Sequence, residues 1–386
     1  MSSSSSPTCT PTWTIHDFYC GLGGWSCGVA AHLRSIGATD AAFHGYEMDA
    51  ELLRQWERNV RAAGFAAVAH HVTIGAETAD ELLPEETGRL LVHFSPPCVV
   101  HSRARRTAPT DEEAAGGAAS LRFALDAVVR KRYKRFSIEN VATESVKRVV
   151  DEYTRLHPWL HARPVCAGDY GCASDRLRLF VAPRGVLDAV GRHPTSSTAA
   201  LDALARHGLA PPHGATHIRN ANTDTQKHRP ITGRSFTIIA SHPLVWTDGR
   251  ETVRCISVEE SAALVGFPPA WKPNANKKLG MRGVGNAVAP CVAQLLAQYL
   301  VQRTTAPAAP AAPAAPAAPG APQPEQAETP LPHAATLLVV ESLAQAIAGL
   351  KRRVDMLEGE WQHRNAVHVN ACGENSLEVG SQELNR

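Results

Sequence analysis

The sequence lacks the cysteine spacings that mark a metal-binding or disulfide-stabilised protein. Its nine cysteines include no C-x-x-C pair, and no His/Cys cluster has the ligand spacing of a zinc site. His157 and His161 are four residues apart, but Pro158 lies between them and no third ligand is apparent. We therefore expect reduced thiols in an intracellular protein, and no metal.

Long apolar runs and a strong net charge are also missing. No stretch approaches the roughly 20 apolar residues of a membrane helix. Residues 1–12 are rich in serine and lack the layout of a signal peptide, so we expect a disordered N-terminus on a soluble protein, in the cytoplasm or the nucleus. The 39 basic and 37 acidic residues give a formal charge of +2, so any nucleic-acid-binding surface has to be local.

A glycine-rich turn follows the first predicted strand, Trp13–Phe18. It leads into a predicted helix that ends near Ser35, and this order lets backbone N–H groups at the start of the helix face a ligand. Ser26 stands where the dinucleotide-binding fingerprint requires its third glycine, so that fingerprint fails. A tight turn without a ligand is the alternative interpretation.

The second predicted strand, Ala42–Tyr46, ends in the acidic run Glu47-Met48-Asp49. A carboxylate at this point, about 26 residues after Gly21, is placed to bind ribose hydroxyls, and Met48 could lie on an adenine face. A solvated acidic turn is the alternative. We expect a helix over Asp49–Ala63 and a third strand near Val72–Ile74.

A cysteine follows the most apolar predicted strand, which begins at Leu90. Pro96 and Pro97 stop this strand, so the Cys98 thiol lies at a sheet edge, where α/β proteins bind ligands. A single cysteine is more often a small buried hydrophobic residue. The basic loop after it, with Arg103, Arg105 and Arg106, indicates either phosphate contacts or a solvated charge run.

Two further segments carry polar groups that suggest a site. The apolar strand Phe136–Val141 ends in Glu139 and Asn140, an acid beside an amide. Arg176 and Arg178 are two residues apart in a predicted strand, so they would share a face and need anionic or strongly polar partners. Helices are expected over 114–130 and 143–156, a second basic block over 130–135, and strand-like order over 234–240.

Composition divides the chain into seven parts. We expect a disordered N-terminus (1–12), a core of alternating strands and helices (13–182), a region of weak periodicity that begins with residues rich in His, Pro, Ala and Thr (183–250), a further C-terminal part (251–303), an Ala/Pro linker (304–332), a coiled-coil helix (333–362) and a disordered tail (363–386). Apolar residues spaced alternately three and four apart predict a parallel coiled-coil homodimer, with a lone amphipathic helix as the alternative. They are Val340, Leu343, Ile347, Leu350, Val354 and Leu357.

Taken together and in order, these motifs resemble those of the cytosine-C5 DNA methyltransferase family. The resemblance covers about Trp13 to Gln302. It rests on Tyr19-Cys20-Gly21-Leu22-Gly23-Gly24, Glu47-Met48-Asp49, Pro96-Pro97-Cys98, Glu139-Asn140-Val141, Arg176-Leu177-Arg178, Gly266-Phe267-Pro268 and Gly285-Asn286-Ala287-Val288.

The resemblance implies an α/β fold: a doubly wound, Rossmann-like, S-adenosylmethionine-dependent methyltransferase sheet. The resemblance makes 13–182 the catalytic and cofactor-binding core and 183–250, after the arginine pair, a small target-recognition region. It also implies that 251–303 returns to the core, so that its last helix lies beside the first, and the coiled-coil tail would come after the core. The activity implied is methyl transfer to carbon 5 of a flipped-out cytosine in double-stranded DNA, through a covalent adduct with Cys98. No metal is implied.

The resemblance also implies roles for individual residues. Catalytic roles fall on Cys98, Glu139, Arg176 and Arg178; cofactor contacts fall on Tyr19, Gly21, Gly23, Gly24, Glu47, Met48 and Asn286; nucleic-acid contacts fall on Ser102, Arg103, Arg105 and Arg106. The sequence departs from the family at Ser174 and Val99, where glutamine is usual, at His101, where phenylalanine is usual, and near His71 and Val72, where an aspartate is missing.

Two other functions are compatible with the same motifs. One branch of the family methylates tRNA and has compact recognition segments, although the Cys-Phe-Thr tripeptide of that branch is absent here. A catalytically inactive DNA-binding or assembly protein on the same scaffold is the second alternative, and the intact catalytic residues argue against it.

Overall fold

The computed structural model describes residues 13–75, 79–97, 111–192, 194–195, 197–221, 227–240 and 244–302. All of them belong to one compact unit, Met1–Ala309. The predicted disordered N-terminus, the Ala/Pro linker, the coiled coil with its proposed homodimer contacts, and the C-terminal tail lie outside the described residues.

The core of this unit is a seven-stranded sheet with the order β3-β2-β1-β4-β5-β7-β6. Only β7 runs antiparallel to its neighbours. The strands are β1 (Thr14–Phe18), β2 (Ala42–Glu47), β3 (Ala66–His71), β4 (Leu90–Phe94), β5 (Phe136–Val141), β6 (Leu160–Cys166) and β7 (Leu177–Pro183). The strand order reverses between β1 and β4, which confirms the predicted doubly wound α/β fold.

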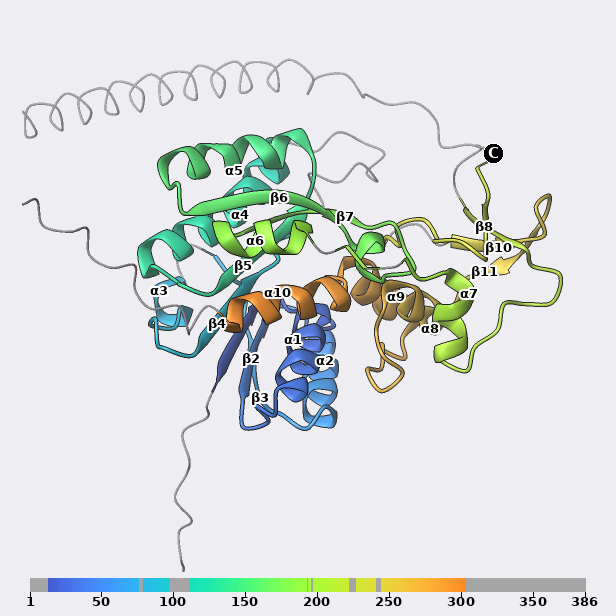
Figure 1. Cartoon of the computed structure of the whole chain (residues 1–386), viewed down its shortest axis with the longest axis horizontal. Helices are drawn as coiled ribbons and strands as arrows, with labels where there is room; N and C mark the ends of the chain where they lie inside the picture. The colour runs from blue at the N-terminus through green and yellow to red at the C-terminus, as the bar shows by residue number, and fades with distance from the viewer. Residues whose placement is uncertain are drawn as a thin grey trace, which may run out of the picture. The chain divides into compact units, whose positions relative to one another are not determined.

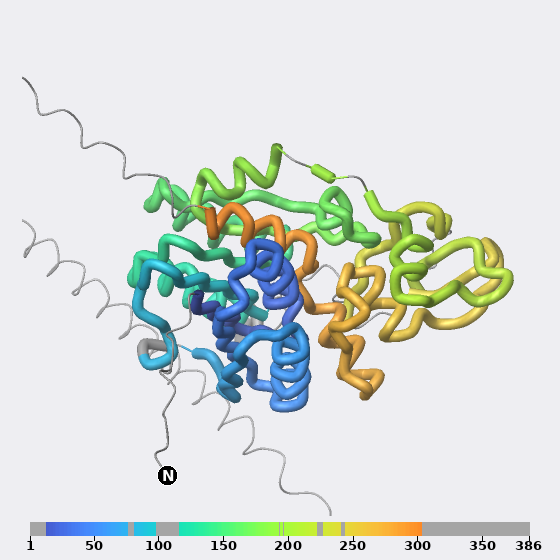
Figure 2. Tube along the Cα trace, turned by 60° about the horizontal axis from the view of Figure 1, so that its bottom comes forward, coloured from blue at the N-terminus to red at the C-terminus, as the bar shows by residue number. Residues whose placement is uncertain are grey.

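Helices cover both faces of this sheet (Figure 1). They are α1 (Gly24–Ser35), α2 (Ala50–Ala62), α3 (Ala79–Leu82), α4 (Asp111–Lys131), α5 (Glu144–Leu156), α6 (Arg184–Arg192) and α10 (Pro290–Gln302). The dark-blue α1 and the orange α10 lie side by side, as Figure 2 also shows, so the last helix of the core returns to the first.

Two buried clusters hold the layers together, one on each face. Trp25, Trp56 and Val292 belong to the cluster under α1, α2 and α10. Phe18 and Phe94 belong to the cluster under α4 and α5, and their rings stack with centroids 4.7 Å apart. Each fully buried large side chain stabilises the fold by about 1.5–3 kcal/mol, so both faces are needed to keep the strand ends in place.

Two strand predictions were wrong, and one strand was missed. The third strand is Ala66–His71, several residues earlier than expected, because its alanines and histidines give no clear alternation. β6 was missed because it contains Arg163 and Pro164, which are tolerated at the edge of a sheet. The segment 234–240 forms no strand and contains isolated bridge residues, among them Ser235, which pairs with Ser174.

A smaller antiparallel sheet lies at one end of the unit, beyond the long sheet (Figure 1). Its order is β11-β10-β8-β9, from β8 (His217–Asn220), β9 (Arg229–Pro230), β10 (Leu244–Thr247) and β11 (Thr252–Cys255). The helices α7 (Ala200–Arg206), α8 (Val258–Val265) and α9 (Lys277–Asn286) complete this part of the chain. α6 packs on β6, β7 and α10, so the first residues after 183 still cover the long sheet.

An ion pair between the exposed Arg254 and the buried Glu260 connects the small sheet to α8. Glu260 accepts hydrogen bonds from the indole of Trp246 at 3.2 Å and from both terminal nitrogens of Arg254 at 2.8 Å. Ser257 and Glu260 also form a capping box at the start of α8. The Glu260 carboxylate therefore links β10, β11 and the start of α8.

Among the described residues, no single helix is long and apolar enough to cross a membrane. α9 and α10 meet that criterion only as a pair, with a bend of 42° between them.

Candidate active site

A cavity of about 470 Å³ lies at the carboxyl ends of β1, β2, β4 and β5. This is the point where the strand order reverses, the usual ligand site of doubly wound sheets. The predicted site residues that line it are Tyr19, Gly21, Gly24, Glu47, Met48, Glu139 and Asn286. The sheet therefore brings together strand ends that are separated by more than 100 residues in the chain.

The glycine turn shapes one wall of the cavity. Gly23 is the N-cap of α1 with φ +86°, a left-handed conformation that favours glycine, and it packs against Trp56 and Trp271. A Cβ on Gly24 would lie 2.0 Å from the carbonyl oxygen of Val288, so no side chain fits there. Gly23 is the one predicted cofactor residue that does not line the cavity itself.

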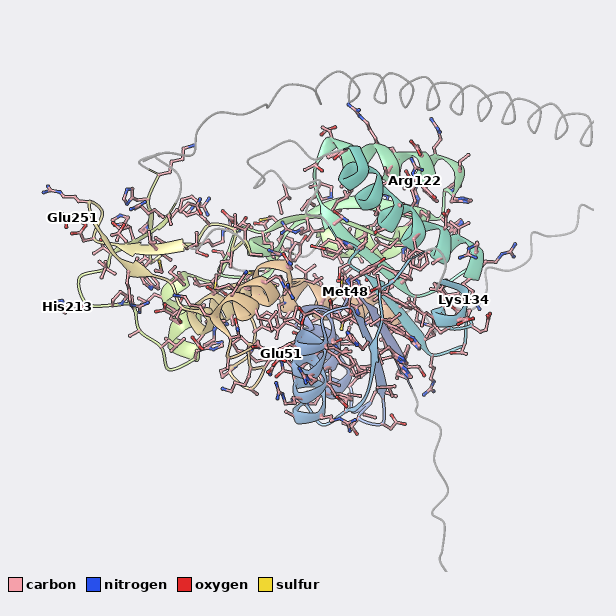
Figure 3. All side chains as sticks on the ribbon, turned by 180° about the vertical axis from the view of Figure 1, so that it is seen from behind. Met48, Glu51, Arg122, Lys134, His213 and Glu251 are labelled. Atoms are coloured by element: carbon pink, nitrogen blue, oxygen red, sulfur yellow. The ribbon has the colours of Figure 1, made fainter. Side chains whose placement is uncertain are left out.

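Glu47 joins the glycine turn to the start of α2. One carboxylate oxygen accepts from the backbone N–H of Gly21 at 3.1 Å and the other accepts from that of Asp49 at 3.0 Å. Met48, labelled in Figure 3 with Glu51 of the following helix, is 64% exposed beside this carboxylate. The acid and the thioether thus occupy the positions at which adenosine contacts were predicted.

Asp17 is a lining residue that sequence reasoning missed. Its side chain is 1% exposed, and Oδ2 accepts from the Ser26 hydroxyl at 2.6 Å. Oδ1 has no hydrogen-bond partner among the described residues. Burial raises the pKa of Asp17 to about 7. The available signal was an acid within a strand that is otherwise mostly apolar, directly before the glycine turn.

Arg282 was missed as well. It lines the cavity from α9 and forms an ion pair with Asp49, which caps α2 by accepting from the N–H groups of Glu51 and Leu52. The guanidinium lowers the pKa of Asp49 together with those backbone bonds, against the opposing effect of burial. This contact joins residues 233 positions apart in the chain, so no local pattern could have predicted it.

The loop before Cys98 is held from two strands. Ser95 donates its backbone N–H to Phe18 at 3.2 Å and its hydroxyl to the carbonyl of Tyr19 at 3.3 Å. Asn140 donates its side-chain amide to the carbonyl of Pro96 at 3.2 Å. Pro96 and Pro97 line the cavity. The amide predicted beside Glu139 therefore positions this loop.

Cys98 itself lies outside the described residues, as do Ser102, Arg103, Arg105 and Arg106. Their predicted roles stay predictions.

Glu139 and Arg178 form a largely buried ion pair beside the cavity. The Arg178 Nε and a Glu139 carboxylate oxygen are 3.1 Å apart, and their side chains are 13% and 7% exposed. The antiparallel register of β5 and β7 places Val141 opposite Arg178, so the two charged groups meet at the sheet edge. An acid and a guanidinium at this point can neutralise charge on a substrate.

Arg176 lies apart from that pair. It precedes β7, is 2% exposed, and donates from Nη1 to the carbonyls of Ile238 at 3.1 Å and Gly285 at 3.0 Å. It does not line the cavity. Arg176 therefore ties the segment between β9 and β10 to the end of α9, where Asn286 lies.

At Ser174 and near His71, where the sequence departs from the family's motifs, the structure shows what the side chains contact. Ser174 donates its hydroxyl to the carbonyl of Phe236 at 2.8 Å, which ties the residues before β7 to the segment between β9 and β10. Near the position where the family's aspartate is missing, the cavity is lined by Val72, Thr73 and Ile74. The Nε2 atom of His71 lies 3.0 Å from the carbonyl oxygen of Met48.

Within the described ranges, no group of three or more His, Cys, Asp or Glu side chains could hold a metal.

The strand order and the cavity at its carboxyl edge define a Rossmann-like methyltransferase fold. Three solved structures share it over 75% of this chain. A presumed DNA modification methyltransferase encoded within an E. coli prophage is 17% identical, with a TM-score of 0.51 and 99% of its own length covered. A mutant of DNMT2 from Spodoptera frugiperda is 13% identical, with a TM-score of 0.50 and 100% covered.

The Dnmt2 methyltransferase of S. pombe is 15% identical, with a TM-score of 0.50 and 99% of its length covered. The chain therefore has the fold of the cytosine-C5 DNA methyltransferases, as its motifs predicted, and at these identities the likeness concerns the fold. No protein-family model and no curated protein matches the sequence.

Proposed function

We propose that this protein is an S-adenosylmethionine-dependent DNA (cytosine-5)-methyltransferase with Cys98 as its nucleophile. The observation that carries the proposal is a single cavity lined by the glycine turn, by the Pro96–Pro97 loop that leads into Cys98, and by Glu139, whose ion-pair partner is Arg178. A cofactor site and an acid suited to a cytosine ring therefore lie in one place.

The residues of the cavity fit an adenosyl cofactor that carries positive charge. A volume of about 470 Å³ lies within the usual range of small-molecule sites. The buried Oδ1 of Asp17 has no partner among the described residues and can accept an ammonium group. The Glu47 carboxylate lies where ribose hydroxyls would bind. When bound, S-adenosylmethionine supplies an electrophilic methyl group.

The proposed chemistry begins with the thiolate of Cys98, whose sulfur bonds to carbon 6 of cytosine and makes carbon 5 nucleophilic. Glu139 reacts in its protonated form: it passes its proton to N3, which neutralises the negative charge in the ring, while Arg178 holds the resulting carboxylate in place and faces the base edge. After carbon 5 takes the methyl group, a base removes the carbon 5 proton, the sulfur leaves as thiolate, and N3 returns its proton to the Glu139 carboxylate. The products are 5-methylcytosine and S-adenosylhomocysteine.

A cytosine inside a duplex cannot reach this cavity. We therefore propose that the base is flipped out, at a cost of a few kcal/mol, and that Ser102 and the Arg103, Arg105 and Arg106 loop contact the phosphates beside it. The small sheet and its loops would contact the target sequence.

The test is transfer of a labelled methyl group from S-adenosylmethionine to unmethylated DNA, run in parallel with tRNA. DNA containing 5-fluorocytosine should trap a covalent complex, because the fluorine cannot leave as the proton does. Cys98→Ala should abolish both transfer and trapping, whereas Cys255→Ala, which removes an exposed thiol in β11, should change neither. Absence of trapping by the unaltered protein would contradict the proposal, and transfer to tRNA alone would move it to the RNA substrate.

A further inference from the structure

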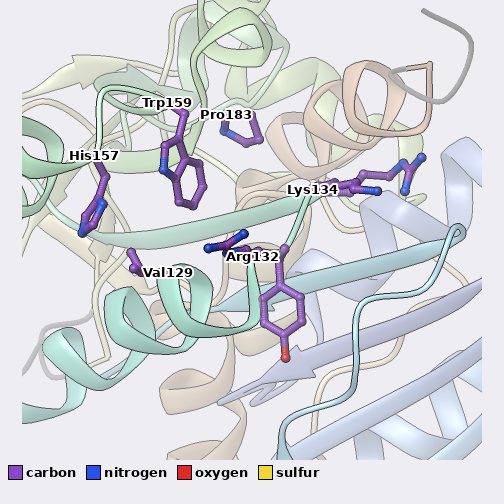
Figure 4. Close-up of a pocket in the computed structure, with 8 residues that line it drawn as sticks. Val129, Arg132, Lys134, His157, Trp159 and Pro183 are labelled. Atoms are coloured by element: carbon purple, nitrogen blue, oxygen red, sulfur yellow. The ribbon is translucent and has the colours of Figure 1, made fainter. Parts of the chain in front are cut away.

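A second cavity lies at the opposite edge of the long sheet. Its volume is about 650 Å³, and it is bounded by the turn between α4 and β5, by the residues before β6 and by the end of β7. Since β5 and β6 begin at this edge, the cavity is separated from the candidate active site by the length of the strands. Figure 4 shows the lining residues, among them Arg132, Lys134, His157 and Trp159.

The turn between α4 and β5 makes this cavity basic. Arg132, Lys134 and Arg135 all line it, and no carboxylate does. Among the described residues, the side chains of Arg132 and Lys134 form no ion pair. Two acids lie near this turn but outside the lining of the cavity: Glu86 accepts from the backbone N–H of Lys134, and Glu85 pairs with Lys131. The lining of the cavity therefore presents cationic side chains and no carboxylate to an anion that enters it.

The backbone at Arg132 is held in an unfavourable conformation. Its φ is +53°, and among the described residues only one other non-glycine residue has positive φ, Tyr19 at the candidate active site. A non-glycine residue held there is often found at functional sites. Here the conformation belongs to the turn that presents the guanidinium to the cavity.

An aromatic surface completes the cavity. Trp159 is 40% exposed, although large aromatic side chains are usually buried. Its ring is fixed from one side by an edge contact with Phe136, at 5.8 Å between centroids and 86° between planes. His157 lies 6.3 Å from it at a tilt of 56°. In Figure 4 the rings of Trp159 and His157 and the side chain of Arg132 surround the same opening.

We propose that this cavity binds one unpaired nucleotide, with its base stacked on Trp159 and its phosphate held by Arg132 and Lys134. A positively charged groove with an exposed aromatic ring is the usual arrangement for single-stranded nucleic acid, because every base has a face that stacks. Lys134 lies at the far end of the molecule from Glu251 of the small sheet (Figure 3), so this site is distinct from the proposed target-recognition surface. The ligand is either a free mononucleotide or one residue of a strand.

The test measures binding of dTMP, thymidine, inorganic phosphate and the octamer (dT)8 to the full chain by calorimetry. A pyrimidine nucleotide is chosen because adenine could also enter the cofactor cavity. Saturating S-adenosylhomocysteine is added for the same reason. We expect dTMP or (dT)8 to bind more tightly than phosphate or thymidine, and its affinity to fall as salt rises.

Three variants locate the site. Trp159→Ala should weaken binding roughly fivefold to hundredfold, and Trp159→Phe should restore most of it. Arg132→Gly removes the guanidinium and suits the left-handed backbone, so loss of binding there cannot be attributed to misfolding. Arg148→Ala, on the exposed face of α5, is the matched control and should bind normally.

Each outcome decides the proposal. Loss of dTMP binding in Trp159→Ala and Arg132→Gly supports a free nucleotide, and the same loss seen only with (dT)8 supports a strand. No binding of either ligand would overturn the proposal, and so would equal binding by all variants. Binding of phosphate as tight as that of dTMP, unaffected by Trp159→Ala, would also overturn it, because the site would then recognise an anion without a base.

Discussion

The two edges of the long sheet carry opposite charge. The cavity at the carboxyl edge is lined by four carboxylates, Asp17, Glu47, Asp49 and Glu139, and one arginine, Arg282. The cavity at the amino edge is lined by two arginines and a lysine and by no carboxylate. One sheet thus separates a site suited to a cationic cofactor from a site suited to an anion. The strand that connects them is β5 (Phe136–Val141), which begins directly after Arg135 and carries Glu139 near its other end.

The two sites also differ in how they are built. The carboxyl-edge cavity depends on residues from both ends of the core, since α9 and the turn after it form one of its walls. The amino-edge cavity depends on one short turn and on the residues before β6. A substitution at one edge of the sheet should therefore leave ligand binding at the other edge unchanged.

The largest expected effect is on catalysis at the carboxyl edge. Glu139→Gln keeps the shape of the side chain but removes the acid, so we expect the single-turnover rate of methyl transfer to fall by about 10²–10³. Binding of dTMP at the amino edge should not change. An unchanged transfer rate would show that Glu139 is not the acid, and a parallel loss of dTMP binding would show that the two edges are coupled.

The next largest effect is on stability. Gly24→Ala places a Cβ against the backbone of Val288, so the free energy of unfolding should fall by about 1–3 kcal/mol. Gly116→Ala is the matched control: it lies in α4 with nothing within 4 Å, and alanine there should raise stability by about 0.5–1 kcal/mol. Denaturant unfolding measures both. Similar effects of the two substitutions would contradict the close approach at Gly24.

A third effect depends on pH. Because Asp17 ionises near pH 7 in the folded protein, binding of cationic S-adenosylmethionine should tighten by about tenfold between pH 6 and pH 8. Asp17→Asn should remove this dependence and bind weakly at both values. Calorimetry at the two pH values measures the change, and an equal slope in the variant would exclude Asp17 as the cause.

The same shift has a consequence for stability. The unfolded carboxyl ionises near its ordinary pKa of 3.8 and the folded one near about 7, so the folded chain holds the extra proton between these values. The contribution of Asp17 to the free energy of unfolding is therefore retained at low pH and is lost as the pH rises through that window. Asp17→Asn should be stabilising relative to the unaltered chain at pH 8 and close to neutral at pH 4.

The smallest effect is expected at the amino edge. Arg132→Gly relieves a left-handed backbone, so the free energy of unfolding should rise by a few tenths up to about 1 kcal/mol. The same change at Arg148, inside α5, should lower it by about 1 kcal/mol. Thermal unfolding of the two variants measures the difference, and equal signs would contradict the conformation at Arg132.

Much of the carboxyl edge could be predicted from the sequence because its residues follow strand ends. Gly21, Glu47, Pro97 and Glu139 each come after a short apolar run, and a parallel sheet brings such positions together. Asp17 and Arg282 were missed for different reasons: the first was taken as part of a strand, and the second acts through an ion pair across the fold.

The amino edge could not be predicted in the same way. The basic block at 130–135 was visible in the sequence, but Trp159 precedes β6, a strand that its arginine and proline concealed. Without β6 there was no reason to place an exposed tryptophan beside that block. Local sequence patterns identified the basic residues, whereas the position of Trp159 beside them depends on tertiary packing.

The packing of α10 along α1 has a consequence for synthesis of the chain. A ribosome that has translated the glycine turn and even Glu139 has not yet made Asn286 or Val288, which form the remaining wall of the carboxyl-edge cavity. Nascent chains that stop before Asn286 therefore lack part of that wall, however well their first strands pair. Premature termination there should leave this cavity incomplete even when every residue of the small sheet has been made.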